Sequence, residues 1–165
     1  MLKCFLLTLV FLICAGCGVI YALDLSARRR QILEMQDLIR CLRREIRCSY
    51  APLPRILSDQ KSASNLPLLR EMELSDPFDL TASYEKSKRF CRGEMFFTEA
   101  EWKVSDQLFH SLGQGDVTEQ ENCLLLADSA FCEAEKNAKT AMEKNGKPAM
   151  VLGCSLGAVL VLMLL

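Results

Sequence analysis

The chain has 165 residues, of which 50% are hydrophobic, and its formal net charge is −1. This length fits one domain, and the near-neutral balance excludes the basic excess typical of a general nucleic-acid binder. The charges are segregated, because residues 4–23 and 148–165 carry none, while all 21 acidic residues and every basic residue except Lys3 lie in residues 24–147. The order is therefore an apolar segment, a polar body and a second apolar segment.

The first apolar segment, residues 4–23, is long enough to cross a bilayer, which takes about 17–25 helical residues. We therefore predict a transmembrane helix over residues 1–23. A lipoprotein is one alternative, since small residues precede Cys17, although Cys14 stands where an aliphatic residue is usual. A cleaved signal peptide is another, but Lys3 is the only basic side chain ahead of the apolar run.

The second apolar segment ends the chain, and we predict a transmembrane helix over residues 148–165. Gly153 and Gly157 form a G-x-x-x-G pattern, which lets two helix backbones approach closely in lipid. We predict membrane helix packing at these glycines; the alternative is that glycine is simply common in such helices. Gly146 and Pro148 are expected to interrupt the connection to the body.

Positive charges flank both apolar segments on the side of the body. The residues that set this bias are Arg28, Arg29, Arg30, Lys144 and Lys147. Because positive flanks stay in the cytoplasm, we predict a two-helix protein of the cell membrane, with residues 24–147 as a cytoplasmic domain. The nine cysteines agree with this location, since an odd, scattered set makes a poor disulfide framework.

The body is predicted to be all-α, a helical bundle, because no segment alternates with a period of two. Residues 27–48 form an amphipathic helix, and no glycine or proline separates it from the first apolar segment. Its apolar seam has spacings of 3, 4, 3 and 4 and consists of Ile32, Met35, Ile39, Leu42 and Ile46. Pro52 and Pro54 should end this helix and begin a short one.

Another side of the same helix is basic. It carries Arg40, Arg43, Arg44 and Arg47. One interpretation is an ordinary solvated face, and the other is contact with anionic headgroups or an acidic partner.

Further helices are predicted in chain order. Short ones cover residues 54–62 and 66–74, and a weaker pattern covers 78–91. Thr98 and Glu101 form a capping box that opens a helix ending at Gly113. Asp116 caps the last helix of the body, which runs to about Asn145.

The residues that carry chemistry are few. His110 is the only histidine, and Asp106 lies one helical turn before it, a spacing more typical of a surface pair than of catalysis. The cysteines and one histidine do not have the spacing of a metal cluster. Cys14 and Cys17 lie in an apolar helix without a polar group to lower a thiol pKa. We therefore expect no enzymatic activity, cofactor, metal, nucleic acid or small-molecule substrate.

Three stretches in order carry a family resemblance: "EIRCSYAPLPRIL" at residues 45–57, "LGQGDVTEQ" at 112–120, and the end of the chain from Ala134. Together they resemble the stage III sporulation protein AB family of endospore-forming bacteria. The resemblance implies a helical cytoplasmic domain similar to one half of the inner-membrane platform protein of type II secretion and type IV pilus machines.

The resemblance also implies a function. The chain would be a structural component of the channel complex between mother cell and forespore, on the mother-cell side, with a secretion-type ATPase and other channel membrane proteins as partners. We hypothesise that the basic face docks this ATPase. The alternatives are a platform-like protein unrelated to sporulation, a membrane signalling protein and a secreted lipoprotein.

Overall fold

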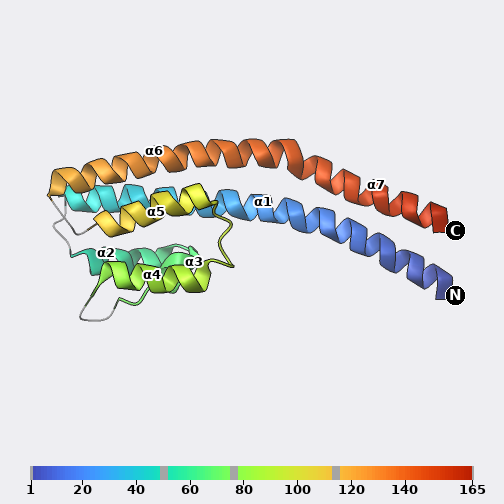
Figure 1. Cartoon of the computed structure of the whole chain (residues 1–165), viewed down its shortest axis with the longest axis horizontal. Helices are drawn as coiled ribbons and strands as arrows, with labels where there is room; N and C mark the ends of the chain where they lie inside the picture. The colour runs from blue at the N-terminus through green and yellow to red at the C-terminus, as the bar shows by residue number, and fades with distance from the viewer. Residues whose placement is uncertain (1, 49–51, 75–77, 113–115, 165) are drawn as a thin grey trace. The chain divides into compact units, whose positions relative to one another are not determined.

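The computed structural model describes residues 2–48, 52–74, 78–112 and 116–164. Throughout these ranges the elements are helices and none is a strand, which confirms the predicted all-α class (Figure 1). The chain divides into two compact units. The first joins residues 1–29 to residues 137–165, and the second comprises residues 30–136.

The first unit contains both apolar ends of the chain. It includes residues 2–29 of α1 (Leu2–Cys48), a π-helical turn η1 (Met142–Gly146) and α7 (Lys147–Leu164). Within the residues that the structure describes, no helix combines the length and the apolarity needed to cross a membrane. The two predicted transmembrane helices therefore stay predictions.

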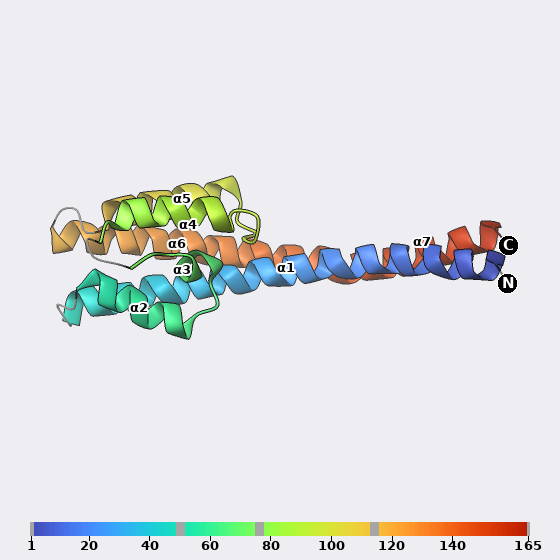
Figure 2. The same ribbon diagram turned by 90° about the horizontal axis from the view of Figure 1, so that it is seen from below.

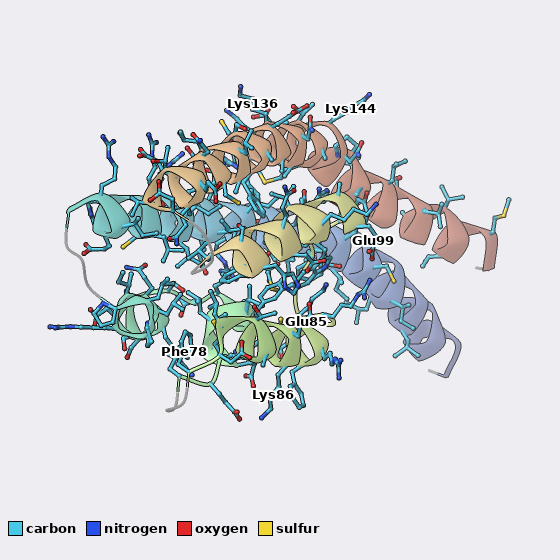
Figure 3. All side chains as sticks on the ribbon, turned by 60° about the vertical axis from the view of Figure 1, so that its left-hand side comes forward. Phe78, Glu85, Lys86, Glu99, Lys136 and Lys144 are labelled. Carbon is cyan, nitrogen blue, oxygen red and sulfur yellow. The ribbon has the colours of Figure 1, made fainter. Side chains whose placement is uncertain are left out.

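The expected break at Gly146 and Pro148 takes the form of a π-helical turn. α6 (Val117–Ala141) passes through η1 into α7 with no non-helical residue between them. Pro148 lies just after the π-helical turn, and it lacks the amide donor that a continuous α-helix would need at this position. The glycine is buried, and Lys144 is exposed and points away from the ribbon (Figure 3).

Two sequence predictions fall partly outside the described side chains. Gly157 is buried, but the surroundings of Gly153 and the side chain of Lys147 are not described. The packing of Gly153 and Gly157 therefore stays a prediction.

The second unit is built around α1 and α6, which run side by side and antiparallel in both views (Figures 1 and 2). The predicted seam of α1 forms the core, with Ile32 and Ile39 fully buried, while Ile46 at its end is half-buried. α6 adds Leu124 and Phe131, which are also buried. The 3,4 spacing therefore located the face of α1 that packs.

The short helices after α1 differ in length from their predictions. α2 (Leu53–Ala63) has bounds close to the predicted 54–62, and it has a proline in its first turn. α3 (Pro67–Arg70) has only four residues, although a helix was predicted over 66–74. Its leucines are buried all the same, because a single turn is enough to direct them into the core.

α4 (Leu80–Cys91) and α5 (Glu99–Ser111) pack on each other through aromatic rings. Tyr84 stacks on Phe109 with ring centroids 4.5 Å apart. The predicted capping box at the start of α5 is confirmed, because the Glu101 amide donates to Thr98 Oγ1 at 3.4 Å and the Thr98 amide donates to Glu101 Oε2 at 2.6 Å. Asp79 caps α4 by accepting from the Ala82 amide, a cap that the sequence pattern did not predict.

The loop between α4 and α5 is fixed by one buried amide on α1. Gln31 Nε2 donates to the Glu94 carbonyl at 2.9 Å, and the Phe96 amide donates to Gln31 Oε1 at 2.8 Å. Hydrogen bonds to a buried amide are costly to break, because its polar atoms would then lack a partner. Gln31 therefore ties the α4–α5 pair to α1.

Candidate functional site

The basic face of α1 lies in the second unit. Its residues recur at spacings of 3, 1 and 3, which place them on one side of the helix. They line a hollow of about 490 Å³, and they are Arg40, Arg43, Arg44 and Arg47. Arg44 is the most exposed of the four, with 71% of its side chain accessible.

Three of these arginines form ion pairs with α6, and the sequence pattern did not predict them. Arg40 Nε lies 3.4 Å from Asp128 Oδ1. Glu121 Oε1 lies 3.7 Å from Arg43 Nε and 3.5 Å from Arg47 Nη1. The face is therefore not a purely solvated one, and it contributes to the packing of α1 against α6.

These contacts are loose. Their distances exceed the usual range of an N–H···O hydrogen bond, about 2.7–3.2 Å. The buried atoms Arg43 Nε and Asp128 Oδ1 make no hydrogen bond. Partly exposed ion pairs of this kind contribute up to about 1 kcal/mol each, so the guanidinium groups keep most of their donor capacity.

Arg44 differs from the other three. Its ion pair is with its neighbour Glu45, at 3.8 Å, and not with α6. Guanidinium groups bind carboxylates and phosphates in a bidentate manner. A row of them around a hollow is suited to an acidic surface, and Arg44 is the member best placed to meet it.

A second polar cluster lies between α4 and α5. Asp106 Oδ1 accepts hydrogen bonds from Tyr84 Oη and from Lys88 Nζ, each at 2.6 Å. The Lys88 ammonium also lies 5.8 Å from the centre of the Trp102 ring, within the range of a cation–π contact. The cluster joins the two helices and is largely shielded from solvent.

Asp106 and His110, which have the spacing of a surface pair, each have hydrogen-bond partners on α4. The histidine instead contacts Glu85 on α4, with 3.2 Å between Nε2 and Oε1. Asp106 faces Lys88 and Tyr84 because α4 packs across it. The i, i+4 spacing on α5 was therefore less important than the contacts between helices.

The pKa values in the cluster fit a structural role. Burial tends to raise the pKa of Asp106, but the hydrogen bonds from Lys88 and Tyr84 outweigh it and lower the pKa below its usual value. Burial, followed by the hydrogen bond to Asp106, raises the pKa of Tyr84. The aspartate stays charged and the phenol stays neutral near pH 7, so neither is poised for proton transfer.

Cys91, a buried cysteine of α4, also lacks the features of a reactive thiol. Burial raises the pKa of Cys91 to about 11, so its thiol is protonated at neutral pH. Cys123 Sγ lies 2.8 Å from Ser111 Oγ. Within the described ranges there is no group of three or more histidine, cysteine, aspartate or glutamate residues that could hold a metal ion.

A hollow of about 540 Å³ separates α5 from α6. Its walls are mainly apolar and include Val104, Leu108 and Leu126. Glu119 is the only titratable carboxylate among the lining residues. The hollow has the character of a packing groove, without a pair of groups that could carry out acid–base chemistry.

The described part of the second unit thus has one hollow lined by arginines and one with mainly apolar walls. Comparison with protein families gives a match to "Stage III sporulation protein AB" over residues 3–165. The chain belongs to this family. This match confirms the resemblance to the stage III sporulation protein AB family seen in the sequence.

A solved structure described as "Stage III sporulation protein AB (SpoIIIAB)" has the same fold. It superposes with a TM-score of 0.64 and 21% sequence identity, covering 71% of this chain and 97% of the other. A comparison with curated proteins found no match. Membership of the stage III sporulation protein AB family supports a role in sporulation, and the family is one of sporulation proteins rather than a known enzyme family.

Proposed function

We propose that the chain is a membrane-anchored scaffold of the channel complex between mother cell and forespore. Its helical body lies in the cytoplasm on the mother-cell side and docks a secretion-type ATPase and other channel membrane proteins. Family membership supports the sporulation role. The single observation that supports docking is the hollow lined by four arginines on α1.

The anchoring part of the proposal is supported by the sequence. Arg28–Arg30 follow the first apolar segment, and Lys144 and Lys147 precede the second, so both positive flanks lie on the side of the body. Such a bias keeps the flank between two membrane helices in the cytoplasm. Both termini then face away from the cytoplasm.

This topology is tested with Phe90→Cys. Phe90 is 67% exposed on α4, so a cysteine there is open to reagents, unlike the buried Cys91. In intact cells a membrane-impermeant maleimide is expected to label Phe90→Cys no more than the parent chain, and to label it more strongly after permeabilisation. Extra labelling before permeabilisation would contradict the cytoplasmic assignment.

Docking through the basic face is argued from exposure and charge. The four guanidinium groups line a hollow open to solvent, and the ion pairs that three of them form with α6 are long, at 3.4–3.7 Å. Arginine is enriched in the energetic centres of interfaces because it combines bidentate hydrogen bonding with apolar stem contacts. An acidic protein surface is the complement of this face.

Arg44→Glu is the variant that tests docking with least effect on the fold. Because Arg44 is 71% exposed and pairs with Glu45 on its own helix, charge reversal should leave the helical spectrum unchanged. It should weaken capture of the purified ATPase by the full chain on the order of tenfold, a loss of about 1.4 kcal/mol. Binding by the parent chain should also weaken as salt is raised from 0.05 to about 0.5 M.

The matched control is Arg89→Glu, an exposed arginine on α4. It changes the net charge by the same amount as Arg44→Glu. Because Arg89 is not part of the basic face, this variant should bind the ATPase like the parent chain. Equal losses in the two variants would show a general charge effect. Unchanged binding by Arg44→Glu would place the docking surface elsewhere.

A further inference from the structure

The ion pairs between α1 and α6 share a spacing. Arg40 and Arg47 are seven residues apart, as are their partners Asp128 and Glu121. Seven helical residues rise about 10.5 Å, close to two turns. The two arginines therefore lie on one side of α1, and the two carboxylates lie on one side of α6. The basic face of α1 thus already contacts a helix with carboxylates two turns apart.

We propose that Glu121 and Asp128 are an internal mimic of the docking partner. The partner segment is an acidic helix with carboxylates seven residues apart, and it competes with these two side chains for the arginines of α1. This inference rests on the proposed docking at the basic face. It adds the spacing of the carboxylates on the partner. It also adds that the ion pairs of α1 with Glu121 and Asp128 limit the affinity for that partner.

The contacts explain why competition is feasible. The ion pairs of Glu121 and Asp128 with the arginines are 3.4–3.7 Å long. Two of the atoms involved, Arg43 Nε and Asp128 Oδ1, are buried and make no hydrogen bond. Carboxylates that approach in the plane of the guanidinium form shorter, bidentate contacts. α6 itself stays in place, because Leu124 and Phe131 are buried in the core. Only the two acidic side chains have to turn away.

The hollow gives the competing helix a place to bind. All four arginines line it, so a carboxylate there can reach Arg44 together with a neighbour that α6 already contacts. Each α6 carboxylate partly neutralises the face and lowers its attraction for a second anion. Removing one of these charges should therefore tighten binding.

The test uses two alanine- and glutamine-based helical peptides of equal length and composition. One carries glutamates seven residues apart, and the other carries them two residues apart, on different sides of the helix. Binding to the full chain in a nonionic detergent is measured by fluorescence anisotropy. The first peptide should bind more tightly than the second, and Glu121→Gln should tighten it further, by about two- to fivefold.

Glu119→Gln is the matched control, since Glu119 is exposed on the same helix and lines the hollow on the α5 side. It should leave the affinity for the first peptide unchanged. Asp128→Asn should act in the same direction as Glu121→Gln, and circular dichroism checks that each variant is folded. Unchanged or weaker peptide binding in both Glu121→Gln and Asp128→Asn would overturn the proposal.

The outcomes separate this inference from the proposed function. If Arg44→Glu loses the ATPase while Glu121→Gln and Asp128→Asn leave peptide binding unchanged, docking at the face stands and the internal mimic is wrong. If Arg44→Glu still binds the ATPase while the two neutral variants tighten the peptide, the pattern stands and the ATPase is not its ligand.

Discussion

Phe109→Ala is expected to lower the free energy of unfolding by about 3–5 kcal/mol, the usual range for a buried phenylalanine. Phe109 is fully buried on α5 and stacks on Tyr84 of α4. The substitution removes the ring, leaves a cavity and deletes the aromatic pair, which itself contributes about 0.5–1.5 kcal/mol. Contact between α4 and α5 depends on this pair more than on any exposed charge.

The measurement is urea denaturation of the full chain in a nonionic detergent, followed by circular dichroism. Phe90→Ala is the control, because Phe90 is 67% exposed on α4 and its truncation should change stability by no more than about 0.5 kcal/mol. Equal effects of the two substitutions would contradict the packing of α4 on α5.

Lys88→Met is expected to lower the free energy of unfolding by about 2 kcal/mol, because it leaves a partly buried carboxylate without its cation. Methionine keeps the apolar part of the lysine side chain, so the loss comes mainly from the charge. Asp106 then retains the hydrogen bond from Tyr84 alone. The double variant Lys88→Met/Asp106→Asn should recover part of the loss.

The pKa of Asp106 determines how the effect of Lys88→Met on stability changes with pH. In the parent chain the folded pKa of Asp106 is lowered, so its contribution to stability is present above the usual aspartate pKa of about 3.9. That contribution is lost as the pH falls through the folded pKa. Without Lys88, burial should dominate and raise the pKa. The contribution of Asp106 should then favour folding at low pH and be lost as the pH rises.

The pH series is measured by denaturation between about pH 3 and 7. Relative to the parent chain, Lys88→Met should lose least stability at the acid end, and Lys88→Met/Asp106→Asn should remove this dependence. A constant difference between Lys88→Met and the parent across the range would contradict the role given to Asp106.

Much of the helical framework was predictable from local pattern. The seam through Ile32 and Ile39 identified the buried face of α1, and Thr98 with Glu101 marked the start of α5. Both depend on spacings within one helix, where backbone geometry decides which side chains meet. α3 was harder, because its buried leucines suggested a longer helix than the single turn that packs them.

Contacts between helices could not be predicted in the same way. Lys88 and Asp106 are 18 residues apart, and their hydrogen bond exists only because α4 packs on α5. The pairing of the arginine face with Glu121 and Asp128 depends on α6 running antiparallel to α1. The matching seven-residue spacings were present in the sequence, but nothing in them specified which helix lies beside α1.

Docking of the ATPase at the basic face is tested most directly by photo-crosslinking in sporulating cells. A photoreactive amino acid replaces Arg44 in the full chain, and a second strain carries it at Arg89. Mass spectrometry then identifies the products after illumination. We expect the ATPase to be crosslinked from position 44 and not from position 89, whereas crosslinking from position 89 with none from position 44 would contradict docking at this face.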